Sequence, residues 1–296
     1  MTTTQQPRIA FLGTGLMGAP MCANLRKKGF ELWVWNRSPE KAAALLPLGA
    51  TLAQSAAEAV SHADVVFTML SNDEAVESLI LDPTTIAAAK PGSVFIDSSS
   101  TRPATAKKLA AALAQHQLQF IDCPVSGGVK GAQEGTLALM AGGPAALIES
   151  LAPVFAALGR LTRVGDHGAG QVAKLANQQI VAITIGAIAE AMTLVSRSGG
   201  SAAAFRDAIR GGFAESTILA LHGERMINRN FEPGGPCKHQ YKDLRNIQSQ
   251  MALHDLQLPL TSSVTELFGT LCENGGADLD HSALLLQIES LNPKEG

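Results

Sequence analysis

The sequence predicts an α/β protein whose first half is a doubly wound parallel sheet and whose second half is all-helical. Two observations carry this prediction. Short apolar runs alternate with helical patterns through residues 1–165, as repeated βαβ units do. From residue 166 the pattern is helical almost to residue 296. We therefore predict a nucleotide-binding domain over residues 1–165 and an all-helical substrate and oligomerisation domain over residues 166–296, with a long interdomain helix.

The first element is the apolar strand Ile9–Leu12, which enters the motif G-x-G-x-x-G and then an amphipathic helix over Leu16–Lys28. In a Rossmann fold the first glycine makes the tight turn, the second lets the backbone approach a pyrophosphate, and the third lets helix and strand pack closely. An ordinary glycine turn is the alternative, and the strand before the motif and the helix after it favour the dinucleotide. The predicted cofactor residues here are Gly13, Thr14, Gly15, Leu16, Met17 and Gly18.

The second strand, Glu31–Trp35, leads to three further predicted cofactor residues, Asn36, Arg37 and Ser38. Ser38 is expected to cap a helix from Pro39 to about Leu46. An acid at the end of this strand would bond the ribose 2′-hydroxyl of NAD, but the chain offers Arg37 instead. Its guanidinium matches a phosphate, so NADP is preferred over NAD. A solvated arginine in a turn is the alternative.

Two buried strands follow, Asp64–Leu70 and Ser93–Ile96, and a helix over Arg102–Ala114 leads to a strand at Gln119–Asp122. Residues 71–74 are expected to cap the helix after the first of these strands. Open parallel sheets bind ligands at the carboxyl ends of their strands, so Met69 and Leu70 are assigned to the cofactor site. The remaining elements of the first domain are Leu137–Ala141, Pro144–Leu158 and Arg160–Val164.

A second glycine-rich stretch covers residues 122–136 and is expected to form a shaped loop. Ser126, Gly127 and Gly128 would expose backbone N–H groups, and such a concavity binds an anion, here expected to be a substrate carboxylate. A plain surface loop is the alternative.

After a glycine hinge at residues 165–170, a long helix is predicted from Gln171 to about Ser196. Lys174, Asn177 and Gln178 share one face of it, because they are three and four residues apart. A lysine in so apolar a stretch is rare unless it ends in a cleft. A lysine that snorkels out of a core helix is the alternative.

The helices expected after this one are Ala202–Ile209, Ser216–Asn228, His239–His254, Pro259–Asn274 and a last one capped by Asp280. Phe231–Pro236 is expected to be a loop, and Lys242 lies where it could reach the cofactor or substrate.

Composition excludes several classes of function. The chain has 296 residues, of which 46% are hydrophobic and 17% charged, so it can bury a core. A net charge of −3 without a long basic run argues against nucleic acid as a partner.

No signal peptide is expected, because the first residues lead directly into the first strand. The charge-free stretch Leu175–Ala189 is too short to span a bilayer, so we expect a cytoplasmic protein without a membrane partner. Four scattered cysteines indicate reduced thiols, and no metal is expected at Cys237 and His239.

Four stretches together resemble one family, the β-hydroxyacid dehydrogenases. They are FLGTGLMGAPMCANL (11–25), DCPVSGGVKGAQEGTL (122–137), GAGQVAKLANQ (168–178) and YKDL (241–244). The second half is similar to the branch that reduces semialdehydes such as 2-hydroxy-3-oxopropionate, through AIRGGFAEST (208–217), NRNFEPG (228–234), LPLTSSV (258–264) and DHSAL (280–284).

The resemblance implies an NAD(P)-dependent reductase of a small carboxylate-bearing semialdehyde that assembles as a homodimer or homotetramer. It implies Lys174 as the catalytic acid and base, Asn177 and Gln178 as substrate contacts, and Ser100 and Lys242 as cofactor contacts. The carboxylate would bind at Ser126, Gly127 and Gly128. Cys123 and residues 235–240 depart from the family pattern. Because residues 235–240 differ, the resemblance does not determine which substrate the enzyme uses.

Three alternatives stay open at this point. One is a sibling dehydrogenase of the family, acting on 3-hydroxyisobutyrate, L-threonate, 4-hydroxybutyrate, glyoxylate or succinic semialdehyde. Another is a non-catalytic nucleotide-binding protein. The third is an imine reductase, which would be expected to replace Lys174.

Overall fold

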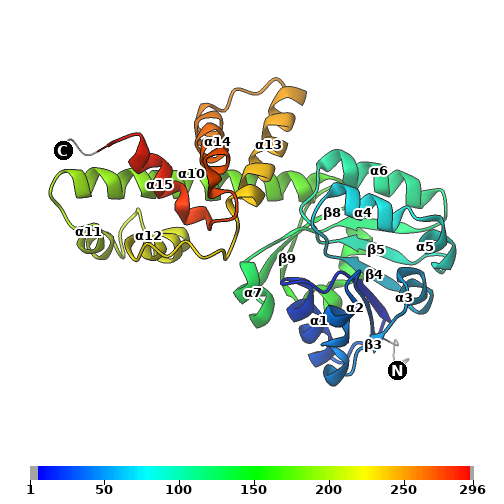
Figure 1. The fold of residues 1–296 in the computed structure, drawn as a ribbon. Helices are drawn as coiled ribbons and strands as arrows, with labels where there is room; N and C mark the ends of the chain where they lie inside the picture. The colour runs from blue at the N-terminus through cyan, green and yellow to red at the C-terminus, as the bar shows by residue number, and fades with distance from the viewer. Residues whose placement is uncertain (1–5, 294–296) are drawn as a thin grey trace. The chain divides into compact units, whose positions relative to one another are not determined.

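The computed structural model describes residues 6–293 (Figure 1). By its internal contacts the chain divides into two compact units, the first ending at Lys174 and the second beginning at Leu175. The first is a mostly parallel α/β unit of the Rossmann type and the second is helical, so the predicted fold class is confirmed. The domain boundary after residue 165 stays a prediction.

Within residues 6–293, nine strands form one sheet in the first unit, in the order β3-β2-β1-β4-β5-β6-β8-β7, with β9 paired to β8. The strands β3, β2, β1, β4, β5 and β6 are parallel, β8 runs antiparallel to β6 and β7, and β9 is parallel to β8. The strand bounds are β1 Ile9–Leu12, β2 Leu32–Trp35, β3 Thr51–Leu52, β4 Val65–Thr68, β5 Val94–Asp97, β6 Gln119–Asp122, β7 Val125–Ser126, β8 Leu137–Gly142 and β9 Gly159–Gly165.

Both faces of this sheet are covered, which is why its strands read as continuous apolar runs. In β1, Ile9 and Phe11 pack into one core and Ala10 and Leu12 into another on the opposite face. Helix α1 covers the first face, and α3, α4 and α6 cover the second. The helices of this unit are α1 Gly18–Lys27, α2 Pro39–Ala43, α3 Ala56–His62, α4 Asp73–Ile80, α5 Pro83–Ala88, α6 Pro103–Ala114, α7 Gly128–Glu134, α8 Ala145–Ser150 and α9 Ala152–Phe155.

The structure corrects the sequence reading of this unit at three places. Residues 122–136 are not one loop, because they form β7 and α7. Ser38 stands at the start of α2, but its side chain makes no capping hydrogen bond. The elements β3, α3 and α5 were not predicted. Asn72, by contrast, caps α4 as expected, by accepting from the N–H of Ala75 at 2.9 Å.

The second unit packs around helix α10 (Ala169–Arg197), which contains the division between the units. Ala182, Ile185 and Ala189 of α10 are buried in one core with Phe268 and Leu284. Helices α13 and α14 lie side by side (Figure 1). The other helices are α11 Ala202–Ala208, α12 Glu224–Ile227, α13 Cys237–Leu253, α14 Pro259–Leu271 and α15 Leu284–Ser290. The helix predicted over Ser216–Asn228 is present over residues 217–227, and it contains a π-helical turn, Leu219–Gly223, just before α12.

The charge-free stretch Leu175–Ala189, predicted to be too short to span a bilayer, is part of a longer helix. Helix α10 has 29 residues, because it continues through the charged residues Lys174 and Glu190. Among the helices of residues 6–293, it is long and apolar enough to cross a membrane by length and composition alone. The core helix of a soluble protein can also be this long and apolar. In α10, 39% of the most apolar 18-residue segment is buried within the structure.

Candidate active site

The turn between β1 and α1 needs glycine at its two ends for reasons of packing. Gly13 has φ +106°, and a Cβ there would overlap the carbonyl oxygen of Met69. A Cβ on Gly18 would overlap the carbonyl oxygen of Gly13. At Gly15 a Cβ would meet nothing within 4 Å, so the space beside this residue is open to a ligand. The turn therefore has the tight ends and the open middle that a pyrophosphate requires.

Three predicted cofactor residues are joined beside this turn. The N–H of Thr14 donates to Oδ1 of Asn36 at 3.0 Å, and Nδ2 of Asn36 donates to the carbonyl oxygen of Ser38 at 3.0 Å. The hydroxyl of Thr14 is buried and finds no hydrogen-bond partner among residues 6–293. Since buried polar groups are almost always bonded, that hydroxyl is suited to bond an atom of a cofactor. Arg37 and Leu16 are exposed, the latter at 80%.

The ends of β4 and β5 are also held together. The N–H of Leu70 donates to Oγ of Ser99 at 2.8 Å. The fully buried carboxyl of Asp97 accepts from Oγ1 of Thr68 at 2.8 Å and from the N–H of Ser99 at 3.1 Å. Burial raises the pKa of Asp97 to about 6, against the effect of these hydrogen bonds. Ser100, the next residue, is partly buried.

The predicted carboxylate binders lie where β7 meets α7. Ser126 pairs with Ala138 of β8, and Gly127 and Gly128 follow with φ of +139° and +62°. Side chains rarely adopt such backbone conformations, which accounts for the two glycines. Both glycines are exposed and Ser126 is partly buried, so their backbone groups can be reached by a ligand.

Lys174 is partly buried on α10, and the two amides that follow it join a polar network within the second unit. Nδ2 of Asn177 donates to Oε1 of Gln178 at 3.0 Å, and Nε2 of Gln178 donates to Oδ2 of Asp243 at 3.1 Å. The other carboxylate oxygen of Asp243 pairs with Nζ of Lys242 at 3.2 Å. Three predicted residues of this unit, Asn177, Gln178 and Lys242, are therefore linked through one buried carboxylate.

Asp243 and Gln240 are members of this network that the sequence reading missed. Gln240 is fully buried and donates from Nε2 to the carbonyl oxygen of Gln178 at 3.1 Å. A sequence signal was present for Asp243, since a charged residue on the buried side of a helix needs a partner. The partner, Gln178, is 65 residues away and could not be named from the sequence.

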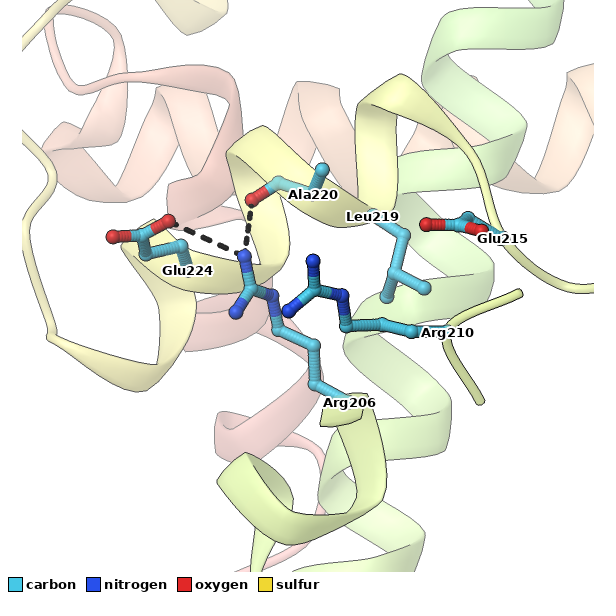
Figure 2. Close-up of a pocket in the computed structure, with 6 residues that line it drawn as sticks. All are labelled: Arg206, Arg210, Glu215, Leu219, Ala220 and Glu224. Atoms are coloured by element: carbon cyan, nitrogen blue, oxygen red, sulfur yellow. Dashed lines mark hydrogen bonds and ion pairs between the residues drawn. The ribbon is translucent and has the colours of Figure 1, made fainter. Parts of the chain in front are cut away.

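A cavity of about 320 Å³ in the second unit contains none of the predicted site residues (Figure 2). Arg206 donates there from Nη2 to the carbonyl oxygen of Ala220 at 2.8 Å and to Glu224 at 3.2 Å. The charged side chains that line this cavity thus include an ion pair that fixes α11 to α12. Among residues 6–293, no group of three or more His, Cys, Asp or Glu is placed to hold a metal ion.

Two protein-family models together match almost the whole chain. Residues 8–168 match the NAD binding domain of 6-phosphogluconate dehydrogenase. Residues 168–288 match the NAD-binding region of NADP-dependent 3-hydroxyisobutyrate dehydrogenase.

Curated relatives cover nearly the full length. A 2-hydroxy-3-oxopropionate reductase of Escherichia coli is 42% identical over 286 residues, which are 95% of this chain and 97% of that protein. A probable 3-hydroxyisobutyrate dehydrogenase of Mycobacterium tuberculosis is 37% identical, over 94% of this chain and 96% of the relative. An NAD-dependent L-serine dehydrogenase of Pseudomonas aeruginosa is 35% identical, with the same coverage of both proteins.

Solved structures agree with these relatives. The 3-hydroxyisobutyrate dehydrogenase of M. tuberculosis with L-serine has a TM-score of 0.88 at 34% identity and covers 98% of this chain and 100% of that one. Psf3 in complex with NADP⁺ and 2-OPP has a TM-score of 0.86 at 25% identity, over 95% of this chain and 99% of that one. An imine reductase from Pseudomonas sp. is 18% identical, and that likeness concerns the fold alone. The chain belongs to the 3-hydroxyisobutyrate dehydrogenase-like family of β-hydroxyacid dehydrogenases, enzymes that use NAD(P) to act on CH–OH groups.

Proposed function

We propose that this enzyme reduces a small carboxylate-bearing semialdehyde of the 2-hydroxy-3-oxopropionate type to the corresponding hydroxy acid, and that it prefers NADP to NAD. The observation that carries the proposal is the 42% identity to the E. coli 2-hydroxy-3-oxopropionate reductase over nearly the full length of both chains.

The cofactor would be held by the first unit. The open space beside Gly15 admits a pyrophosphate, and the buried Thr14 hydroxyl offers a donor that has no protein partner among residues 6–293. The exposed Arg37, at the end of β2, suits a ribose 2′-phosphate because a guanidinium binds phosphate with two parallel hydrogen bonds. When bound, the cofactor supplies the hydride.

Lys174 would act as the general acid. As an ammonium it would donate a proton to the oxygen of the substrate carbonyl while negative charge develops there, and in the oxidative direction the amine would take the proton back. A positioned acid of this kind contributes about 10² to 10⁴ in rate. Its place on the partly buried side of α10 limits competition from water.

The substrate carboxylate would bind to Ser126 and to the backbone N–H groups of Gly127 and Gly128. Asn177 and Gln178 would orient the hydroxyl or carbonyl, since their amides are held in place by the hydrogen bond between them and by Asp243. Lys242, paired with Asp243, would contact the cofactor.

The experiment is an NADPH oxidation assay with 2-hydroxy-3-oxopropionate, glyoxylate and succinic semialdehyde, run beside the reverse reaction with 3-hydroxyisobutyrate, L-threonate and 4-hydroxybutyrate. The proposal expects the highest kcat/KM with 2-hydroxy-3-oxopropionate. Lys174→Ala should lower kcat by about 10² or more while NADPH still binds. Lys108→Ala, which removes an α6 lysine paired with Glu77, is the control and should keep wild-type turnover. Wild-type turnover in Lys174→Ala would overturn the assignment.

A second candidate is a dehydrogenase of 3-hydroxyisobutyrate or L-serine, which the relatives of 37% and 35% identity favour. The same substrate panel separates the two candidates, because the second expects oxidation of one of these hydroxy acids with NAD to be faster than reduction of the semialdehyde.

We further propose a cytoplasmic homodimer or homotetramer. Several large apolar side chains of the second unit are exposed, Ile180, Leu194 and Leu260 each by more than half. Contact with another copy would remove them from water. Light scattering during size-exclusion chromatography tests this, and a monomer would contradict it.

A further inference from the structure

Helix α10, which carries Lys174, is anchored at its start by a carboxylate of the sheet. Asp122, the last residue of β6, accepts from the N–H of Gly168 at 2.7 Å through Oδ1 and from the N–H of Gln171 at 3.0 Å through Oδ2. The first N–H groups of a helix have no partner within the helix. A carboxylate there also complements the positive end of the helix dipole. Asp122 thus caps α10 from a strand 46 residues earlier in the chain.

The packing at this anchor leaves no room for a different arrangement. A Cβ on Gly142 would lie 2.7 Å from Oδ1 of Asp122 and from the nitrogen of Gly170, and one on Gly170 would lie 2.8 Å from Oδ2 of Asp122. The carboxyl group is fully buried. Burial raises its pKa, and the two N–H donors act in the opposite direction by favouring the ionised form.

Gln171 holds the same turn of α10 from its other side. Its Nε2 donates to the carbonyl oxygen of Ser99 at 2.8 Å, and its Oε1 accepts from the N–H of Thr101 at 3.0 Å. The side chain is fully buried, so both hydrogen bonds are protected from water. The two bonds bracket Ser100, the predicted cofactor contact, and tie its loop to the helix of Lys174.

We infer that Asp122 and Gln171 are positioning residues of the reaction, which fix the first turn of α10 and thereby the place of the Lys174 amine. The inference rests on the proposed role of Lys174. Lys174 follows Gln171 by three residues, which puts it one turn along the same side of the helix. A misplacement of about 1 Å in a catalytic group can cost about 10²-fold in rate, so an anchor at this turn bears directly on turnover.

The variants are Asp122→Asn, which replaces one acceptor by a donor that faces a backbone N–H, and Gln171→Met, which removes both side-chain hydrogen bonds at similar volume. Each should lower kcat by about 10²-fold. Asp122→Asn should leave KM for NADPH within about threefold, because residues 13–18 and the loop of Ser100 keep their hydrogen bonds, whereas Gln171→Met also releases that loop and should raise this KM. If the two residues served stability alone, the variants would have a lower unfolding temperature but no specific loss of kcat relative to KM.

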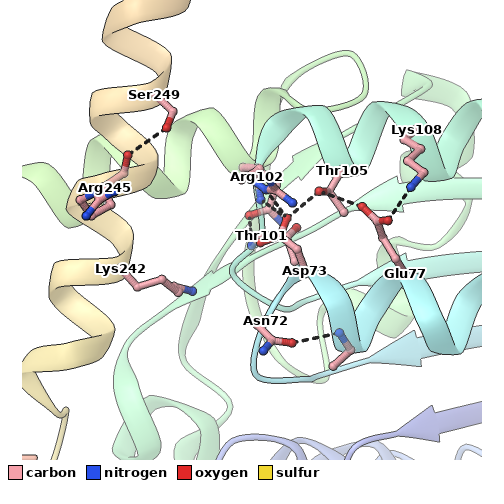
Figure 3. Close-up of polar contacts among 12 residues, drawn as sticks. Asn72, Asp73, Glu77, Thr101, Arg102, Thr105, Lys108, Lys242, Arg245 and Ser249 are labelled. Atoms are coloured by element: carbon pink, nitrogen blue, oxygen red, sulfur yellow. Dashed lines mark hydrogen bonds and ion pairs between the residues drawn. The ribbon is translucent and has the colours of Figure 1, made fainter.

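Asp73→Asn is the matched control. Asp73 is another buried carboxylate that holds the start of a helix, since it accepts from the N–H of Arg102 at 2.9 Å and from Oγ1 of Thr105 at 2.5 Å (Figure 3). The helix that it holds is α6, which carries none of the predicted site residues. Asp73→Asn should lower the unfolding temperature as Asp122→Asn does and keep kcat near the wild-type value.

The decisive measurement repeats both substitutions on the Lys174→Ala background. If Asp122 and Gln171 act through Lys174, their effects on the residual kcat should shrink to less than about threefold there. Equal losses with and without Lys174, or losses no larger than that of Asp73→Asn, would overturn the inference and leave the proposed function standing. Full turnover of Lys174→Ala would instead overturn the proposed function, and the inference with it. If Asp122→Asn does not fold, Gln171→Met decides by its loss of kcat with and without Lys174.

Discussion

Asp97 and Asp122 are register partners on the adjacent parallel strands β5 and β6, and both carboxyl groups are fully buried. The two carboxyl groups accept hydrogen bonds from different parts of the first unit. Asp97 ties together Thr68, Ser99 and Thr101 at the strand ends, whereas Asp122 anchors α10. Burial raises the pKa of both carboxyls, that of Asp97 to about 6. Because burial penalises the charged form of each carboxyl, both groups couple stability to pH.

Asp97→Asn should change the pH dependence of stability with a definite sign. The folded pKa of about 6 lies above the ordinary value of 3.8, so between these values the folded state binds more protons than the unfolded state. The contribution of Asp97 to the free energy of unfolding therefore falls as pH rises from about 4 to 6. A shift of about two units corresponds to roughly 3 kcal/mol, so relative to wild type the variant should gain stability of that order across this window.

Urea unfolding at pH 4, 5, 6 and 7 measures this difference. Altered hydrogen bonding to Thr68 and Ser99 adds a constant offset, which does not vary with pH. Asp207→Asn, at an exposed position of α11, is the control and should show no such trend. A pH-independent difference between Asp97→Asn and wild type would contradict the prediction.

Arg37→Asp should turn the cofactor preference from NADP to NAD. A carboxylate at the end of β2 would repel the 2′-phosphate and accept a hydrogen bond from the ribose 2′-hydroxyl. We expect the ratio of kcat/KM for NADPH to that for NADH to fall by about 10² or more, because a bonded cation is replaced by an anion. Lys41→Asp, an exposed charge reversal on α2, makes the same change in net charge and should move the ratio little. An unchanged ratio in Arg37→Asp would place the 2′-phosphate elsewhere.

Gln178→Met should weaken substrate binding. The variant removes the donor to Asp243 and the acceptor for Asn177, which leaves the Asn177 amide without its orienting bond to Gln178. Loss of such a bond corresponds to about a tenfold rise in KM for the semialdehyde, with KM for NADPH little changed. Gln179→Met is the control, because the neighbouring glutamine bonds Thr261 at 2.7 Å. An equal rise in KM for the semialdehyde in both variants would contradict a specific role of Gln178, because it would show a general effect of replacing a glutamine on α10.

The sequence predicted those elements whose signals are local. The strand Gln119–Asp122 has its predicted bounds, and Asn72 caps α4, because apolar runs and capping residues act within a few positions. The missed elements are short. Strand β3 has two residues, α3 has seven and α5 has six, and the local caps of the two helices, Ser55 and Asp82, were overlooked in the sequence. Helix α7 stands where glycines indicated a loop.

In the candidate site, too, residues within local motifs were predicted and residues held by distant contacts were not. Motifs located Gly13, Ser126 and Lys174, but their supporting side chains depend on contacts far apart in the sequence. Asp122 bonds Gln171 across 49 positions, and Gln178 bonds Asp243 across 65. Such pairs form only when the fold brings them together, and a single sequence carries no trace of the pairing.

Gly18→Ala and Gly15→Ala should separate packing from cofactor binding within one motif. At position 18 the new Cβ would overlap the carbonyl oxygen of Gly13 and lie 3.0 Å from Cε1 of Phe11, so α1 must move away from β1. Overpacking of this kind costs about 1–3 kcal/mol in the free energy of unfolding. At position 15 the Cβ meets nothing within 4 Å, so stability should stay within about 0.5 kcal/mol of wild type.

Gly15→Ala should nevertheless raise the Kd for NADPH by about tenfold or more, because the methyl group occupies the space that the pyrophosphate needs. Urea unfolding and titration of NADPH fluorescence measure the two quantities on the same preparations. Both variants are needed, because a general intolerance of alanine in this turn would change stability and NADPH affinity together. If Gly15→Ala binds NADPH as tightly as wild type, the open space beside Gly15 is not where the pyrophosphate lies.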